Sequence, residues 1–306
     1  MNTRSIGIIG LGWVGASTAL SILHGGICKE LLLNDLKPGL AEGEAMDLNH
    51  GSSFYPPATV KAVEIQDMKH CDAIVITAGK GGTAKQSRLE LLKDNVGIAR
   101  GISSQLNDFR GILIIVANPV DVLTYFYQQF SSLPPSRVIG TGTMLDTARL
   151  RDITGSALNL DPRSIHAQVV GEHGDSEVVL WSSAQIGGVP LREYGSWQEK
   201  LETVIANEVK TAAYEIISRK GSTNHAIGLV TAALLKWMLR GERRVMTVSS
   251  VINGTLGLHN VALSLPSVVS EQGVEETLAP AMSQEERESL HHSANILKKA
   301  IQDAGQ

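Results

Sequence analysis

The stretch around His173 contains residue types that suit proton transfer. In the sequence GEHGD, residues 171–175, this histidine stands between two glycines and two carboxylates. Gly171 and Gly174 leave it little side-chain cover, as expected where a ligand or a backbone approaches closely. Imidazole gains and loses a proton near neutral pH. A lone histidine is usually structural, but this setting favours an acid/base role for His173.

Asp146 and Arg149 could support such a histidine. We expect a helix from about residue 145, and two residues three apart share one face of a helix. One interpretation is an intrahelical ion pair that contributes roughly a few tenths of a kcal/mol. In the other, Asp146 orients the histidine and Arg149 binds a carboxylate with its two-pronged guanidinium. Spacing alone favours the ion pair.

Arg88 is a further candidate. It follows a stretch of glycines and small polar residues, 80–87, that predicts a mobile surface loop, and it opens an expected helix over residues 89–106. A basic residue at a helix N-terminus opposes the helix dipole, which favours a ligand-facing role for Arg88. A lid that carries an arginine would exclude water and bring a charged donor to a substrate when it closes.

The first half of the chain has the pattern of a nucleotide-binding unit. Residues 5–9 read as a buried strand, GLGWVG follows at 10–15, and a helix pattern runs from 16 to 24. Gly10 permits a tight turn, Gly12 lets the backbone approach a pyrophosphate, and Gly15 lets helix and strand pack closely. The phosphates would lie at the helix N-terminus, where free N–H groups favour anions.

Asp35 ends a second strand, residues 31–34, and lies 20 residues after Gly15. An acid at this place accepts hydrogen bonds from the adenine ribose and repels a 2′-phosphate, so NAD is favoured over NADP. The alternative is a turn residue before Lys37. The glycines upstream favour ribose binding.

Strands expected at 60–63, 73–77 and 112–116 alternate with helices, which predicts a doubly wound parallel sheet of the Rossmann type in an α/β protein. Two loops, Thr77-Ala78-Gly79 and the one that holds Asn118, follow such strands. Ligands bind at the carboxyl ends of strands in these sheets, so both loops would face the cofactor. Asn118 could equally be a turn former before Pro119.

The second half predicts an α+β substrate domain. We expect a strand at 165–170, helices at 197–219 and 223–240, strands at 244–251 and 261–264, and a helix at 283–304. Thr223 would be either the N-cap of its helix or a hydroxyl that faces a pocket. We place the division between an NAD-binding domain, 1–143, and the substrate domain, 144–306.

Composition limits the function classes. The net charge of −4 argues against a general nucleic-acid binder, no apolar run suits a bilayer, and the first ten residues lack a secretory pattern. Cys28 and Cys71 fit reduced packing residues of a cytoplasmic protein. The pair His291-His292 fits a solvated helix face better than a metal site, so we expect no metal.

Motifs along the whole chain share one family pattern. They are IIGLGWVG (8–15), LLLND (31–35), TAG (77–79), SRLELLKDN (87–95), ANPVD (117–121), GTGTMLDTARLR (140–151), GEHGDS (171–176), KGSTNHAIG (220–228) and HHSANILK (291–298). On these motifs the chain resembles the L-lactate dehydrogenase group of L-2-hydroxy acid dehydrogenases. The segments IIGLGWVGA, GTGTMLDTAR and LDPRS also look like the branch that acts on L-2-hydroxyisocaproate.

The resemblance implies reversible hydride transfer between NADH and a 2-oxo monocarboxylate, together with roles for matching residues. Arg149 would bind the substrate carboxylate, His173 would be the acid/base that Asp146 holds, and Arg88 on a closing loop would polarise the carbonyl. Asn118 would bond near the same oxygen, and Thr223 would shape the pocket. The implied cofactor residues are Gly10, Gly12, Trp13, Val14, Gly15, Asp35, Thr77, Ala78, Gly79, Asn118 and Ile227.

Gly82 departs from the family pattern. Its position is usually glutamine in lactate dehydrogenases and arginine in malate dehydrogenases. Without an arginine, a dicarboxylate lacks its second counter-charge, so malate is disfavoured. Without glutamine the pocket is roomier, which leaves open a preference for acids larger than lactate, such as L-2-hydroxyisocaproate or phenyllactate.

Arg151 and His166 match positions where allosteric bacterial members bind fructose 1,6-bisphosphate between subunits. We hypothesise activation by this sugar phosphate in a homotetramer. The alternative, that the residues are retained without the response, is equally consistent with the sequence.

Two other classes of protein remain as alternatives. NAD-dependent glycosidases share a similar nucleotide-binding fold, but they would need a metal-binding Cys/His set in the second half, and both cysteines lie in the first. A non-catalytic NAD sensor would have no reason to keep Asp146, Arg149, His173 and Arg88 together.

Overall fold

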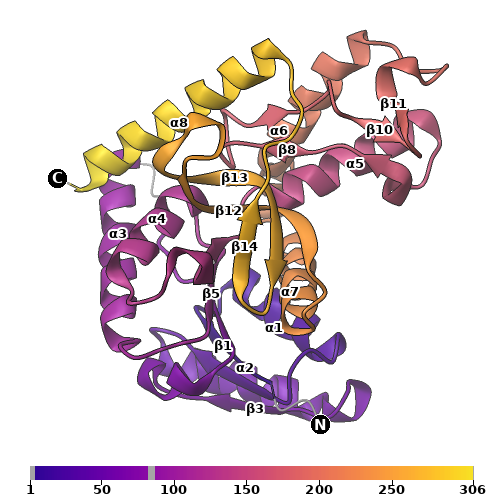
Figure 1. The fold of residues 1–306 in the computed structure, drawn as a ribbon. Coiled ribbons are helices and arrows are strands. Elements are labelled where there is room, and N and C mark those ends of the chain that lie inside the picture. Colours follow the sequence, from indigo (N-terminus) through magenta and orange to yellow (C-terminus); the bar gives the residue numbers. More distant parts are fainter. Residues whose placement is uncertain (1–3, 82–86, 306) are drawn as a thin grey trace.

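The computed structural model describes residues 4–81 and 87–305, and within them nine strands form one sheet with helices on both faces (Figure 1). Six strands are parallel, in the order β3 (Thr59–Ala62), β2 (Glu30–Asn34), β1 (Ser5–Ile9), β4 (Ala73–Ile76), β5 (Ile112–Ile115) and β6 (Val138–Gly140). This 3-2-1-4-5-6 order is that of the Rossmann fold, whose strand order reverses between β1 and β4. The α/β class and the doubly wound fold are therefore confirmed.

The sheet as a whole is mixed, which the sequence did not predict. β12 (Arg244–Asn253) pairs antiparallel with β6 through Ser249 and Gly140, and the antiparallel strands β13 (His259–Ser270) and β14 (Gly273–Thr277) extend the same sheet. The second half of the chain thus continues the sheet of the first. The division expected at residues 143/144 stays a prediction.

Strand residues alternate between two hydrophobic cores, because successive side chains point to opposite faces. Ile74 and Ile76 belong to one core, and Ala73 and Val75 to the other. The helices that cover the two faces are α1 (Trp13–His24), α2 (Pro38–His50), α3 (Arg88–Gln105), α4 (Val120–Phe130), α5 (Met144–Leu158), α7 (His225–Leu239) and α8 (Gln284–Gly305). A further helix, α6 (Lys200–Lys220), packs on α5 and contributes Ile205 and Val209 to a third core. None of the helices in the described ranges is both long and apolar enough to cross a bilayer.

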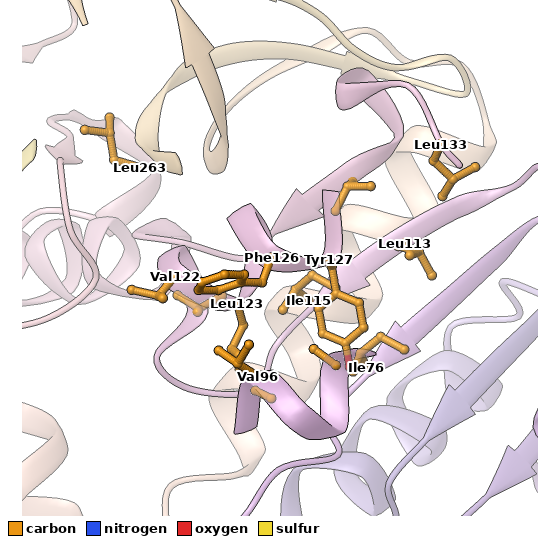
Figure 2. Packing of buried hydrophobic residues seen from close by; sticks show 14 of the residues in the cluster. Ile76, Val96, Leu113, Ile115, Val122, Leu123, Phe126, Tyr127, Leu133 and Leu263 are labelled. Carbon is orange, nitrogen blue, oxygen red and sulfur yellow. The ribbon is translucent and has the colours of Figure 1, made fainter. Parts of the chain in front are cut away.

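The core under α3 and α4 fixes the loops that follow β4 and β5. Figure 2 shows Phe126 and Tyr127 of α4 gathered with Ile76, Ile115 and Val96. Ile76 and Ile115 are the last residues of their strands, and both are fully buried. Packing at these strand ends holds the two loops against the sheet edge where a cofactor is expected.

The single strand expected at 165–170 is wrong. The segment forms β7 (Ile165–His166) and β8 (Val169–Val170), which pair with different partners, β10 (Gln185–Ile186) and β9 (Val178–Val179). This change of partner cannot be recognised from the sequence, because the six residues read as one short strand. The remaining short elements are β11 (Val189–Pro190) and the 3₁₀ turns η1 (Ser52–Phe54), η2 (Ile65–His70), η3 (Pro135–Arg137), η4 (Pro162–Ser164), η5 (Leu191–Glu193) and η6 (Thr255–Gly257).

Thr223 is not the N-cap of its helix. α7 begins at His225, and the capping position is Asn224. The Asn224 amide donates to Ser17 Oγ on α1 at 2.7 Å, and Gly228 packs so closely on Ser17 that a Cβ there would lie 2.9 Å from its backbone. Contact with α1, which is 207 residues away in sequence, therefore determines where α7 starts.

Candidate active site

Asp146 joins the two side chains that the sequence placed beside it. Its Oδ2 lies 2.6 Å from His173 Nδ1, and its Oδ1 accepts a hydrogen bond from Arg149 at 2.9 Å. The Asp146 side chain is 3% exposed, whereas that of His173 is 25% exposed. The intrahelical ion pair of the first interpretation is present, and the other carboxylate oxygen of Asp146 meets the histidine as the second requires. Binding of a substrate carboxylate by Arg149 stays a prediction.

His173 is arranged to be a cation in the free protein. Burial disfavours the imidazolium, but the charge and hydrogen bond of Asp146 outweigh it and raise the pKa of His173 to about 9. Because Nδ1 faces Asp146, Nε2 is the nitrogen that remains for a substrate. The arrangement suits delivery of a proton to an oxygen at neutral pH.

The backbone of the His173 loop is tied to the sheet. Gly171 has φ +87°, a left-handed conformation that favours glycine, and it exchanges two hydrogen bonds with Ser264 of β13, each 2.9 Å long. The left-handed backbone and these two bonds explain why position 171 is a glycine, in addition to the lack of side-chain cover that the sequence indicated.

Asp121 is a site residue that the sequence reasoning missed. Its Oδ2 accepts a hydrogen bond from the His173 backbone N–H at 2.7 Å, and the residue is 1% exposed on α4. Burial raises the pKa of Asp121 to about 6, and the hydrogen bond from the His173 N–H acts in the opposite direction. The only sequence signal was its place at the end of the ANPVD motif.

Asp121→Ala is expected to lower the free energy of unfolding by about 1–3 kcal/mol, because the His173 N–H loses its buried acceptor. Asp121→Asn keeps an acceptor oxygen and removes a buried carboxylate, so its free energy of unfolding should stay within about 1 kcal/mol of the wild type. Urea denaturation of both variants checks this. Equal losses for alanine and asparagine would show that the hydrogen bond is not what Asp121 contributes.

Glu177 also lies beside His173 and Asp146, and it was not predicted as a site residue. Burial, and next the charge of Asp146, raise the pKa of its carboxyl. Its Oε1 is buried without a hydrogen-bond partner among the described residues.

The glycine loop fits a dinucleotide. Gly10 has φ +96°, and a Cβ on Gly15 would lie 2.0 Å from the Gly10 carbonyl oxygen, so α1 can approach β1 only with glycine at 15. A Cβ on Gly12 would meet nothing within 4 Å among the described residues. That open side is where a pyrophosphate would approach the first N–H groups of α1, which begin at Trp13 and Val14.

Asp35 is the turn residue before Lys37 and also bonds the glycine loop, while its binding of the adenine ribose stays a prediction. Its Oδ1 accepts from Lys37 N–H at 2.9 Å, as in a turn, and its Oδ2 accepts from Leu11 N–H in the glycine loop at 2.7 Å. Asp35 also lines a 510 Å³ cavity with Glu42, Glu64 and Asp67. These carboxylates would repel a 2′-phosphate, which agrees with NAD as the cofactor.

Asn95 holds together the two loops that end β4 and β5. Its Oδ1 accepts from Lys80 N–H at 2.7 Å, and its Nδ2 donates to the Asn118 carbonyl at 3.4 Å. Thr77 donates to the Gly10 carbonyl at 2.5 Å, which joins the TAG loop to the glycine loop. Thr77, Gly79 and Asn118 thus share one edge of the sheet. Asn95 is the last residue of the SRLELLKDN motif, but no role was predicted for it.

For the remaining predicted site residues that it describes, the structure gives a position in the fold and a degree of exposure. Arg88 is the exposed first residue of α3, where Ser87 and Glu90 form a reciprocal capping box. Gly82 lies outside the described residues. Thr223 is half-buried before α7, and Ile227 packs at the edge of the core beneath α1. Trp13, the first residue of α1, is 72% exposed.

Comparison with known proteins gives the family. The model of the lactate/malate dehydrogenase NAD-binding domain matches residues 4–140, and that of the α/β C-terminal domain matches residues 143–306. The chain belongs to the lactate/malate dehydrogenase family. It is an NAD-dependent dehydrogenase of L-2-hydroxy acids, as the motifs implied, and its nucleotide site is that of the family's NAD-binding domain.

Relatives of this dehydrogenase cover its whole length. It is 44% identical to the L-lactate dehydrogenase of Fervidobacterium nodosum, with 97% of each chain covered, and 43% identical to that of a Synechococcus species, with 96% and 97% covered. The minor L-lactate dehydrogenase of Enterococcus mundtii, solved with bound ligands, superposes with a TM-score of 0.96 at 39% identity and covers 98% of each chain.

Proposed function

We propose that the protein interconverts pyruvate and L-lactate, and that His173, Asp146 and Arg149 carry the reaction. The observation that supports this is the single buried Asp146 carboxylate that meets both His173 and Arg149. A proton donor and a carboxylate binder are thereby fixed side by side. The compared relatives are L-lactate dehydrogenases, which favours lactate over larger 2-hydroxy acids.

In the proposed mechanism Arg149 holds the substrate carboxylate with two parallel hydrogen bonds. His173 donates its Nε2 proton to the 2-oxo oxygen, which becomes the hydroxyl of the product. Asp146 keeps the ring oriented and favours its cation until the proton leaves. When bound, the nicotinamide supplies the hydride that C2 receives, or accepts it in the reverse reaction. The ketone is reduced, NADH is oxidised, and one proton is consumed.

Arg88 and Asn118 complete the proposal. The Arg88 guanidinium at the start of α3 would polarise the carbonyl, and Asn118 would donate to the same oxygen. Thr223 would bound the pocket near Ile227. Gly12, the α1 N-terminus and Asp35 would hold the pyrophosphate and ribose of NAD.

The substrate proposal is tested by initial rates of NADH oxidation with pyruvate, 2-oxobutyrate, 2-oxoisocaproate and phenylpyruvate. We expect pyruvate to give the highest kcat/KM. A higher value for 2-oxoisocaproate or phenylpyruvate would overturn lactate as the natural product and would favour the larger 2-hydroxy acids that the sequence leaves open.

The pH dependence follows from the pKa of His173, which Asp146 holds at about 9. Reduction needs the imidazolium, so kcat/KM for pyruvate should be constant below this pKa and fall about tenfold per pH unit above it. Oxidation of L-lactate needs neutral imidazole and should rise towards the same pH. Asp146→Asn removes the carboxylate charge, so the break should move to lower pH. An unmoved break would contradict the role of Asp146.

We also propose a cytoplasmic homotetramer. Trp13, Phe54 and Leu229 are 72%, 87% and 64% exposed and line a 700 Å³ groove along α1, η1 and α7, and such an apolar patch supports self-association. Cys28 and Cys71 are free and buried, which suits a reducing compartment. Light scattering should give the mass of four chains, and a monomer would overturn this proposal.

Fructose 1,6-bisphosphate is the proposed effector at Arg151 and His166. Arg151 donates to the Ala167 carbonyl at 3.0 Å, so its side chain lies beside the residue that follows His166. Arg151 and Arg163 also line one 300 Å³ cavity. If substrate affinity and oligomer mass both stay unchanged when the sugar phosphate is added, the residues are retained without the response.

A further inference from the structure

The C-terminal helix α8 lies along the segment that carries His173. It crosses one end of the molecule, packs against β9 and β13, and also contacts α3 and α4 (Figure 1). Leu290 and Ser293 are fully buried on the face that it turns to the protein. The proposed mechanism assigns no role to a residue of this helix.

One buried hydroxyl of α8 meets the His173 loop on both sides of the histidine. Ser293 Oγ accepts a hydrogen bond from Glu172 N–H at 2.9 Å, and it is hydrogen-bonded to Ser176 Oγ at 3.0 Å. The Ser176 hydroxyl also donates to the Glu172 carboxylate. A Cβ on Gly171 would lie 2.9 Å from Ser293 Oγ, so the loop rests directly on this hydroxyl.

A second contact fixes the same helix to the chain just beyond the loop. Glu286, in the first turn of α8, accepts from Ser182 N–H at 2.9 Å and from the Ser182 hydroxyl. Glu286 and Ser283 also form a capping box, with N···O distances of 2.8 and 3.1 Å. The turn that starts the helix is therefore also attached to the catalytic segment.

We propose that Ser293 is a positioning residue for His173. Asp146 fixes the imidazole ring and Asp121 fixes the His173 N–H, while Ser293 fixes Glu172 and Ser176 on either side. Two backbone bonds hold Gly171 to Ser264, and Ser176 bonds Glu172 within the loop, so Ser293 is the residue that attaches both Glu172 and Ser176 to α8. A displacement of about 1 Å at a catalytic group can cost about a hundredfold in rate. This inference rests on the proposed acid/base role of His173.

The test is Ser293→Ala, with Ser289→Ala as the matched control, since Ser289 is an exposed serine one turn earlier on α8. For Ser293→Ala we expect kcat for pyruvate to fall about tenfold to a hundredfold. NADH affinity, measured by fluorescence, should be unchanged, and deuterated NADH should show a larger isotope effect on kcat because proton delivery and hydride transfer become slower. The control should match the wild type in all three measurements. Ser176→Ala removes the bond to Ser293 and the side-chain bond to Glu172 but keeps the bond from Glu172 N–H to Ser293, so its fall in kcat should be smaller.

A lower melting temperature with wild-type kcat and isotope effect in Ser293→Ala would overturn the proposal, because Ser293 would then be only structural. Amide hydrogen exchange of residues 172–176 gives a readout that does not depend on turnover, and exchange should be faster in Ser293→Ala. If the wild type reduces no 2-oxo acid, the proposed function fails while the exchange result still decides whether Ser293 restrains the loop. Unchanged exchange would overturn the positioning role even if kcat falls.

Discussion

His173→Asn is expected to lower kcat for pyruvate reduction by about 10³-fold or more. Asparagine is of similar size and can still donate to Asp146, but it cannot deliver a proton, and removal of a general acid typically costs about 10²- to 10⁴-fold. NADH affinity should stay close to that of the wild type, because the glycine loop and Asp35 lie on other elements. Stopped-flow absorbance and NADH fluorescence measure the two quantities.

His259→Asn is the matched control, since His259 is an exposed histidine at the start of β13 and should leave kcat unchanged. If His173→Asn only halves the rate, another group delivers the proton and the assigned role is wrong. If NADH affinity falls as strongly as kcat, the residue acts through the cofactor site and not through the substrate oxygen.

Arg149→Gln is expected to lower kcat/KM for pyruvate by roughly thirtyfold to a few thousandfold, mainly through KM. Loss of a charged partner from a desolvated pair typically costs about 2–5 kcal/mol, and the Arg149 side chain is 14% exposed. Arg149→Lys keeps the charge and loses the two-pronged geometry, so its loss should be intermediate. Steady-state kinetics with pyruvate measures both variants.

Arg219→Gln tests the structural explanation for the Arg149 result. Arg219 makes an intrahelical ion pair with Glu215 at 2.8 Å, and its side chain is 79% exposed. This control should leave KM unchanged. If Arg149→Gln behaves like it, with a wild-type KM and only a small change in stability, Arg149 serves the helix and does not bind the substrate.

Local patterns in the sequence predicted the strands and turns that depend mainly on neighbouring residues. β1 spans Ser5–Ile9 as expected, and the GLGWVG glycines explain both the tight turn at Gly10 and the close packing at Gly15. Apolar runs predicted five of the six parallel strands to within a residue or two, and β6 (Val138–Gly140) was not expected. The family resemblance, and not the spacing, gave Asp146 and Arg149 their separate roles.

The supports of the site could not be predicted, because they join distant parts of the chain. Asp121 meets His173 across 52 residues, and Ser293 meets Glu172 across 121. An aspartate near a helix start or a serine inside a helix has an ordinary local pattern, and only the packed fold gives it a partner. The same reason explains why α7 begins after Asn224, and why residues 165–170 divide between two small sheets.

In the proposed reaction His173 gives the proton and Arg149 binds the carboxylate while a hydride is transferred to a 2-oxo monocarboxylate. The most direct measurement uses the wild-type protein with pyruvate and NADH that carries deuterium at the reactive C4 position, followed by chiral and mass analysis of the product. We predict L-lactate with one deuterium at C2, formed in a one-to-one ratio with NAD⁺. Absence of turnover with pyruvate, 2-oxobutyrate, 2-oxoisocaproate and phenylpyruvate alike, or a product without deuterium at C2, would contradict it.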